Sequence, residues 1–218
     1  NPAILPARLS VQTACKEKYG WDDPVDNVLV DQWNKAVSCW TSTVIYVPRL
    51  IKPKTSAVVD LQVFCDASGH SYGACAYLVV QHSDATRSAH LVFSRSRLKP
   101  LNANLTIPRL ELMAGVLGAR LIDFLQKQLT VKAPKATLHT DSQVVFFWIK
   151  SQEKQPVFVE NRLKEIRALI DLHGIALRYV PTELNPADVL SRGIRADQLQ
   201  DHDLWWHGPH FLKESEDR

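Results

Sequence analysis

The sequence lacks the features that mark membrane, secreted and zinc-binding proteins. It has no hydrophobic run long enough to cross a bilayer and no signal peptide, so we expect an intracellular protein that is not secreted. Its four cysteines form no CxxC pair and no zinc pattern with histidine, which favours a reducing compartment. The chain begins with Asn1 instead of Met, and we expect it to be cut from a longer polypeptide.

A strong charge of one sign is also missing, because the net charge of the 218 residues is only +3. This slight excess of Lys and Arg permits a nucleic-acid partner without indicating one. The hydrophobic and charged fractions, 45% and 22%, are those of an ordinary soluble globular protein. The length suits one good core with an appendage, or two small domains.

The first 58 residues differ in pattern from the rest of the chain. Helical spacing of apolar residues predicts short helices over residues 9–19 and 26–40, followed later by a loop at 52–54. No group of residues in this segment has catalytic spacing. We interpret its tryptophans as packing anchors in the core or at an interface, with nucleic-acid stacking as the alternative.

From residue 58 onward, strands and helices alternate. Three strands joined by short turns predict an antiparallel meander. We predict strands over residues 58–66, 72–81, 89–94, 136–140 and 175–180, and helices over 107–129, 142–150 and 157–172, with a last short helix between Asn185 and Gly193. This order indicates an α/β fold with a mixed five-stranded sheet flanked by helices.

Four acidic residues stand out by position: Asp66, Glu111, Asp141 and Asp188. Asp66 and Asp141 each end a predicted strand, and Asp188 lies in the first turn of the last short helix. Each Asp has a structural alternative, as a turn residue, a helix N-cap or a partner of the helix dipole. Glu111 lies on the packed side of the long helix, where a lone carboxylate costs several kcal/mol unless it is paired, protonated or metal-bound.

Taken together, the four acids predict a metal site. Adjacent first and fourth strands place Asp66 and Asp141 side by side, and the two helices bring Glu111 and Asp188 to them. Clustered carboxylates repel one another unless cations neutralise them, and hard oxygen ligands suit Mg²⁺ or Mn²⁺. Two such ions about 4 Å apart clamp a phosphodiester during hydrolysis. His139, next to Asp141, is expected to point to the opposite face of its strand.

These motifs resemble the ribonuclease H domain of reverse transcriptases. The resemblance rests on Asp66, Glu111, Thr140-Asp141-Ser142-Gln143 and Asn185-Pro186-Ala187-Asp188-Val189-Leu190-Ser191-Arg192-Gly193. More narrowly, the chain resembles the BEL/Pao class of LTR retrotransposons. That match rests on Trp21-Asp22-Asp23-Pro24, Ile107-Pro108-Arg109-Leu110-Glu111-Leu112, Phe158-Val159-Glu160-Asn161-Arg162 and Trp205-Trp206-His207-Gly208-Pro209-His210-Phe211-Leu212.

The resemblance implies an endonuclease that hydrolyses the RNA strand of RNA–DNA hybrids during reverse transcription. It assigns the binding of two Mg²⁺ ions, with Mn²⁺ as a substitute, to Asp66, Glu111, Asp141 and Asp188. It implies that residues 1–58 tether the domain to a polymerase, that 59–195 form the ribonuclease H domain, and that 196–218 link it to an integrase. A cytoplasmic location within a virus-like particle follows from the same resemblance.

Contacts with the hybrid are implied as well. In retroviral relatives the Ser-Gln after the third acid touches the minor groove, which makes Ser142 and Gln143 candidates. Arg109 and Arg192 flank two of the acids and are candidate phosphate contacts, with ordinary exposed arginines as the alternative. Ser68, in the turn after Asp66, completes this set.

Two departures from the relatives concern turnover and grip. The loop at 181–185 has no His of the kind that retroviral enzymes carry before the last Asp, which suggests slower turnover or another route for that step. Only residues 151–156 stand where some relatives insert a basic helix. We therefore predict that the isolated chain binds hybrid weakly, with further grip from the tether or the polymerase.

The sequence leaves other functions open. An integrase on the same fold has no acid on the long helix, which Glu111 contradicts, and a proofreading exonuclease needs a second acid two residues after Asp66, where Ser68 stands. A catalytically silent connection module or a domesticated host derivative is the alternative from a different class. The presence of all four acids argues against a silent module.

Overall fold

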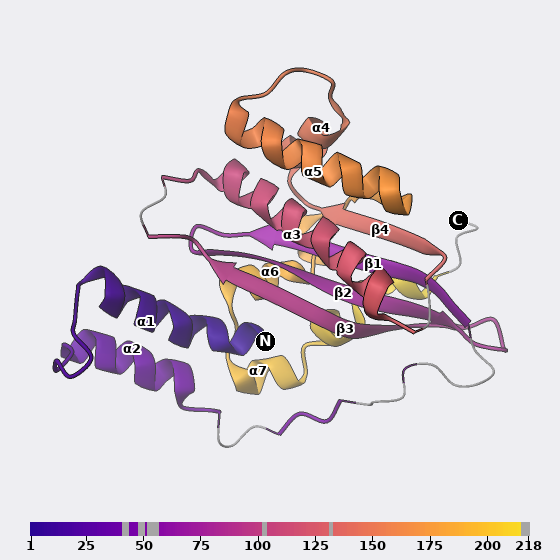
Figure 1. The fold of residues 1–218 in the computed structure, drawn as a ribbon. Coiled ribbons are helices and arrows are strands. Elements are labelled where there is room, and N and C mark those ends of the chain that lie inside the picture. Colours follow the sequence, from indigo (N-terminus) through magenta and orange to yellow (C-terminus); the bar gives the residue numbers. More distant parts are fainter. Residues whose placement is uncertain (41–43, 48–50, 52–56, 102–103, 131–132, 215–218) are drawn as a thin grey trace.

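The computed structural model describes residues 1–40, 44–47, 51, 57–101, 104–130 and 133–214. Its described strands form one sheet in the order β3-β2-β1-β4-β5 (Figure 1). They are β1 (Ala57–Ala67), β2 (Ser71–Gln81), β3 (Arg87–Leu98), β4 (Lys135–Thr140) and β5 (Ala176–Tyr179). The first three pair antiparallel, whereas β4 runs parallel to β1 and β5 parallel to β4. The predicted mixed five-stranded sheet is confirmed.

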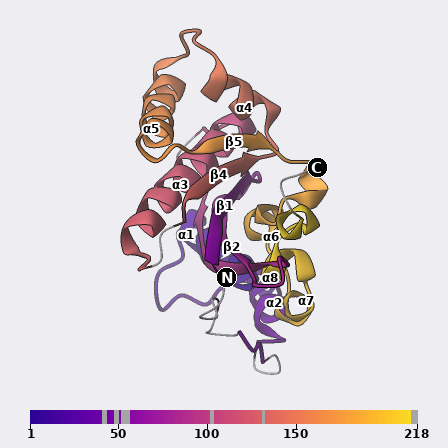
Figure 2. The same ribbon diagram turned by 90° about the vertical axis from the view of Figure 1, so that its right-hand side faces the viewer.

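One face of the sheet is covered by three helices whose predicted bounds are correct to within one residue. They are α3 (Ile107–Gln128), α4 (Gln143–Lys150) and α5 (Val157–His173), and Figure 2 shows α3 and α5 on this side. Alternate residues of β1, including Leu61 and Val63, point into this layer and are fully buried. Gly118 allows the close approach of α3, because a Cβ there would lie 2.6 Å from the side chain of Leu138.

The C-terminal part of the chain covers the opposite face of the sheet (Figure 2). It contains the short helices η2 (Thr182–Leu184), α6 (Ala187–Arg192), α7 (Ala196–Gln200), α8 (Asp203–His207) and η3 (His210–Lys213). Trp205 is 2% exposed, and its carbonyl oxygen accepts a 2.7 Å hydrogen bond from the hydroxyl of Tyr77 on β2. Leu199 and Leu212 are buried in the same cluster. Described residues beyond 195 therefore contribute to the core, and the role of this segment as a linker stays a prediction.

The N-terminal segment forms η1 (Pro2–Ile4), α1 (Leu5–Lys16) and α2 (Asn27–Val37). Helix α1 starts four residues earlier than predicted, and its contacts with α6 attach the segment to the sheet domain. Trp21 is fully exposed between the two helices, so it is not a core residue, and its role as an interface anchor stays a prediction. Trp33 and Trp40 are more than a third exposed. The predicted loop at 52–54 lies outside the described residues.

Across the ranges that the structure describes, no helix combines the length and the apolar character that crossing a bilayer requires.

Candidate active site

Two of the four acids lie side by side where adjacent strands end. Asp66 is the last residue but one of β1, and Asp141 directly follows β4. The parallel register pairs Cys65 with Thr140, so the next residue on each strand is one of these two aspartates. The structure thus places Asp66 beside Asp141, as the adjacent strand ends predict.

Asp66 is the most deeply buried of the four acids, with 7% of its surface exposed. Burial, together with the charges of Asp141 and Asp188, raises the pKa of Asp66 to about 7. The hydroxyl of Ser191 opposes this shift by donating a hydrogen bond to Asp66. Three carboxylates therefore lie within electrostatic reach of one another, in a site that favours a proton or a cation.

Glu111 approaches from the second turn of α3 and is half-buried. Its Oε2 accepts a 2.6 Å hydrogen bond from the hydroxyl of Ser142. Burial raises the pKa of Glu111, the hydrogen bond from Ser142 lowers it, and the charge of Asp141 raises it. Ser142 is also the N-cap of α4, where its hydroxyl accepts a bond from the backbone N–H of Val145. One serine therefore fixes both the start of α4 and the position of Glu111.

Asp188 reaches the site on α6, and hydrogen bonds hold α6 against the end of β1. Asn185 is 1% exposed, and its amide donates to the carbonyl oxygen of Cys65 at 3.1 Å. The hydroxyls of Ser68 and Ser71 donate to the carbonyl oxygen of Ser191 at 2.7 and 2.6 Å. No sequence pattern predicts this role for Ser191. Its position three residues after Asp188, on the same side of the helix, is the signal that would have found it.

The residues predicted to touch a hybrid differ in their exposure and in the contacts that their side chains already make. Gln143 is exposed at the start of α4. Ser142 is 6% exposed and bound to Glu111, and the hydroxyl of Ser68 is used within its own turn and on α6. Arg192 pairs with Asp188, and the guanidinium of Arg109 lies 5.1 Å from the ring centre of Phe158. Hybrid contact stays a prediction for the set, and the two serines visibly position protein groups.

The chemistry of the four acids fits a hard divalent cation, because all the expected ligands are carboxylates. Within the described ranges, however, no three His, Cys, Asp or Glu side chains are grouped as ligands of one ion. Each of three carboxylates is bonded to a protein group instead: Asp66 to Ser191, Glu111 to Ser142, and Asp188 to Arg192. Each of these bonds uses one oxygen of the carboxylate, so the other oxygen remains for a cation.

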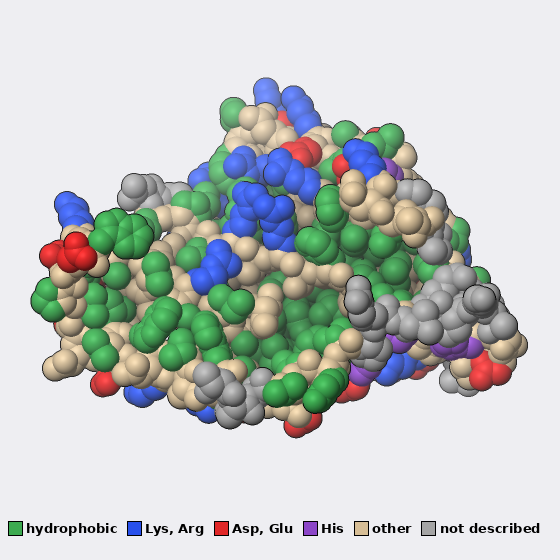
Figure 3. Space-filling view, turned by 60° about the horizontal axis from the view of Figure 1, so that its bottom comes forward, with side chains coloured by type: hydrophobic (Ala, Val, Ile, Leu, Met, Phe, Trp, Pro, Cys, Tyr) green, Lys and Arg blue, Asp and Glu red, His purple; other side chains and the backbone are tan. Residues whose placement is uncertain are grey.

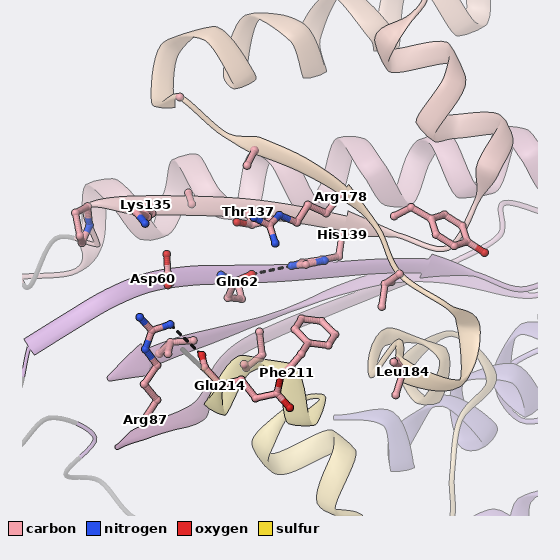
Figure 4. Close-up of a pocket in the computed structure, with 18 of the residues that line it drawn as sticks. Asp60, Gln62, Arg87, Lys135, Thr137, His139, Arg178, Leu184, Phe211 and Glu214 are labelled. Atoms are coloured by element: carbon pink, nitrogen blue, oxygen red, sulfur yellow. Dashed lines mark hydrogen bonds between the residues drawn. The ribbon is translucent and has the colours of Figure 1, made fainter. Parts of the chain in front are cut away.

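His139 lies on the other face of the sheet, as strand alternation predicts. Its ring stacks on Phe64 with centroids 4.4 Å apart, and its Nε2 is hydrogen-bonded to Gln62 at 2.7 Å (Figure 4). Burial, aided by the charge of Arg178, lowers the pKa of His139 to about 3. Together with Gln62 it lines a pocket of about 850 Å³ between the sheet and η3. His139 is therefore no base for the four acids.

This order of helices, strands and acids matches a known family. The model of the Pao retrotransposon-like RNaseH-like domain matches residues 1–142, well over half of the chain. The chain belongs to this family. The matched part of this Pao-type domain includes the N-terminal helices together with Asp66, Glu111 and Asp141, and it ends before Asp188. The resemblance to the ribonuclease H domain of a Pao-class element is confirmed.

Among solved structures, the Pao-type domain is similar to the N-terminal RNase H domain of rv2228c from Mycobacterium tuberculosis, with 19% identity, a TM-score of 0.42, and 65% of this chain and 98% of that chain covered. LC11-RNase H1 in complex with an RNA/DNA hybrid matches with 15% identity and a TM-score of 0.39, over 60% of this chain and 91% of that chain. The foamy viral protease-reverse transcriptase with an RNA/DNA hybrid matches with 14% identity and a TM-score of 0.33, over 78% and 26%. No curated protein sequence matches the chain. These structural likenesses are distant, and the family assignment rests on the sequence match.

Proposed function

We propose that this Pao-type domain is an endonuclease that hydrolyses the RNA strand of RNA–DNA hybrids during reverse transcription of a retrotransposon. The observation that carries the proposal is the pair Asp66 and Asp141 at adjoining strand ends, with Glu111 and Asp188 brought to the same edge. Burial and neighbouring charge raise the pKa of Asp66 to about 7. Perturbed carboxylates of this kind gather at functional sites.

The proposed cofactors are two Mg²⁺ ions, with Mn²⁺ as a substitute, and the proposed ligands are the four carboxylates. Such ions supply positive charge that stabilises the attacking and leaving oxygens of an in-line displacement at phosphorus. Asp66 must lose its proton to serve as a ligand, which the burial of its carboxyl group opposes. Ser191 supports the charged form of Asp66, and Ser142 supports that of Glu111.

The nucleophile in this proposal is water, because the protein groups near the acids are poorly suited to attack. The hydroxyls of Ser142 and Ser191 donate to carboxylates of the site. Burial raises the pKa of the Cys65 thiol and of the Cys75 thiol, so neither forms a thiolate at neutral pH. Cleavage then leaves a 5′-phosphate and a 3′-hydroxyl without a covalent enzyme intermediate, as the family resemblance implies.

The same proposal covers the partners and the place of the domain. An RNA–DNA hybrid is the substrate, the polymerase of the same polyprotein is joined through residues 1–58, and an integrase follows residues 196–218. The domain would act in the cytoplasm within a virus-like particle. These partners follow from the family resemblance.

The test is cleavage of an end-labelled RNA–DNA hybrid in Mg²⁺ or Mn²⁺, with single-stranded RNA and duplex RNA as controls. We expect metal-dependent cutting of the hybrid alone, and loss of cutting in Asp66→Asn. Lys164→Gln, an exposed change on α5, is the matched control and keeps full activity. Hybrid binding without cutting, even with the polymerase added in trans, would reject the proposal.

A silent connection module is the second candidate, and one observation favours it. Asp66, Glu111 and Asp188 already bond to protein groups, which is how carboxylates with a structural role are arranged. If the domain is such a scaffold, Asp66→Asn should change neither the binding nor the cleavage of hybrid by the polymerase-linked protein. The same cleavage assay therefore separates the two candidates.

A further inference from the structure

Five arginines gather on the face of the molecule that α3 covers: Arg95, Arg97, Arg109, Arg120 and Arg162. We call this set the arginine face. Arg97 lies opposite Tyr72 in the β2–β3 register, and Arg95 lies opposite Ala74, so both point to the same side as these core residues. The contact of Phe93 on β3 with Phe124 on α3, 5.5 Å between ring centres, confirms this orientation. Both arginines are exposed.

The other three arginines come from α3 and α5, and two of them, Arg120 and Arg162, lie close to the same tyrosine. Burial lowers the pKa of Arg162, the neighbouring Tyr72 raises it, and the charges of Arg120 and Arg109 lower it. Tyr72 also acts on Arg120. The side chains of Arg109 and Arg162 both lie over the ring of Phe158, at 5.1 and 3.4 Å. Strand β3 and helices α3 and α5 thus direct positive charge to one area. Figure 3 shows a gathering of Lys and Arg side chains on this side.

Little negative charge balances this area. Among the described residues, the acid that acts on Arg120 and Arg162 is Glu165. Its bidentate pair with Arg120 is exposed, with 55% of the Arg120 side chain open to solvent. Exposed pairs are worth only about 0–1 kcal/mol, so Arg120 exchanges this partner readily for a phosphate. This carboxylate acts on two of the five guanidinium groups, so the area keeps a net positive charge.

The arginine face begins beside the four acids and extends away from them. Arg109 precedes Glu111 by two residues on α3, and Arg97 shares the sheet edge of Asp66 through the pairing of Ala67 with Tyr72. The eleven helical steps from Arg109 to Arg120 span roughly 16 Å at 1.5 Å per residue. That length matches about five base pairs of duplex at 3.4 Å each.

We propose that the arginine face binds the sugar–phosphate backbone of the hybrid as it leaves the four acids. This inference rests on the proposed function. The acids themselves repel phosphates, so the duplex must be held by charge elsewhere, and no basic helix stands at residues 151–156 to hold it. Guanidinium groups bind phosphate oxygens through two parallel hydrogen bonds, and the five arginines offer several such groups on one face. The contact reads backbone and is independent of base sequence.

The test measures binding apart from cleavage, with the full chain carrying Asp66→Asn in EDTA and a fluorescent RNA–DNA hybrid. The triple change Arg95→Gln, Arg97→Gln, Arg120→Gln removes three exposed positive charges. Lys35→Gln, Lys164→Gln, Arg178→Gln is the control, which removes the same number of exposed positive charges outside the arginine face. We expect the arginine triple to weaken binding at 0.1 M salt by about tenfold or more and to lower the salt slope by about 2–3. The control should change affinity less than twofold.

Equal weakening by both triples would overturn the proposal, because it would indicate net charge and not a defined face. If the triple variant lowers the thermal midpoint, the double change at Arg95 and Arg97 on the exposed edge strand replaces it. In the active chain, the triple should raise KM and leave kcat unchanged. If the unmodified chain fails to cleave hybrid but the arginine triple still weakens binding, the proposed function alone is rejected. If the unmodified chain cleaves hybrid and the arginine triple binds it with unchanged affinity, the role of the arginine face alone is rejected.

Discussion

At the scale of single residues, Asp66 shows a conflict between charge and burial. Its carboxyl group is nearly enclosed, two further acids repel it, and one serine hydroxyl is its side-chain partner. In the absence of a cation the folded protein is stabilised by protonating this group. Residues of catalytic sites often lower stability in this way.

Asp66→Asn should therefore stabilise the metal-free protein at pH 8. The folded state keeps a proton up to about pH 7, whereas the carboxyl group has an ordinary pKa of 3.8, so stability falls as pH rises through that window. Removing the charge should raise the free energy of unfolding by about 1–3 kcal/mol in EDTA, because the lost bond to Ser191 offsets part of the gain. Urea unfolding measures this. Destabilisation in EDTA would contradict the burial argument.

His139 gives a prediction of the opposite sign. The pKa of His139 is about 3 in the folded protein against an ordinary 6.5, so the unfolded chain binds a proton that the folded protein does not. Its stabilising effect is present above pH 6.5 and is lost as pH falls towards 3. Between pH 7 and pH 5 the wild type should lose about 2 kcal/mol more than His139→Gln, which has no titrating ring. Equal losses in the two proteins would show that the ring is solvated.

At the scale of elements, α6 depends on side-chain bonds more than on its own length. It has six residues, and its attachment to β1 passes through Asn185, Ser191, Ser68 and Ser71. A helix this short is not stable alone, so its position is set by these contacts. The place of Asp188 is therefore decided by residues that carry no charge.

Asn185→Ala should move α6 and with it Asp188. The change leaves the carbonyl of Cys65 and the N–H of Ala187 without their partners, which costs roughly 1–3 kcal/mol for buried groups. If the proposed function holds, cleavage should fall more than tenfold. Asn104→Ala, at an exposed position, is the matched control with neither effect. Unchanged activity in Asn185→Ala would show that α6 is held in place without this residue.

The elements around the acids follow from sequence, whereas their mutual attachment does not. Period-two and helical patterns locate β1, β2, β4, α3 and α5 to within a residue or two, and strand order follows from the meander and the crossover. The bonds of Ser191 and Ser142 to acids escape such patterns, because they join residues more than 30 positions apart. Helix α7 also escapes, since its single buried turn presents only Ala196 and Leu199 to the core.

At the scale of the whole molecule, both ends of the chain complete the domain. The described C-terminal residues pack on β2 and β3, and α1 contacts α6. The sheet is thus sandwiched between layers that are distant in sequence. The core of the domain extends beyond the matched residues 1–142.

Trp205→Ala should destabilise the whole domain by about 3–5 kcal/mol, because it opens a large cavity over β2. Total stabilities of domains are only about 5–15 kcal/mol, so the variant should be prone to unfolding near body temperature. Trp21→Ala, at a fully exposed position, should change the free energy of unfolding by less than about 0.5 kcal/mol. Thermal and urea unfolding of both variants measure this. An unchanged free energy of unfolding in Trp205→Ala would contradict the assignment of Trp205 to the core.

Because Trp205 and Leu212 lie near the C-terminal end of the sequence, they are synthesised well after the strands that they cover. During synthesis, β2 and β3 leave the ribosome long before α8 and η3, which cover Tyr77 and its neighbours. At 5–20 residues per second, this delay is on the order of ten seconds. Throughout it, an apolar sheet surface has no cover of its own. The nascent domain is therefore a natural client for a chaperone until its final helices emerge.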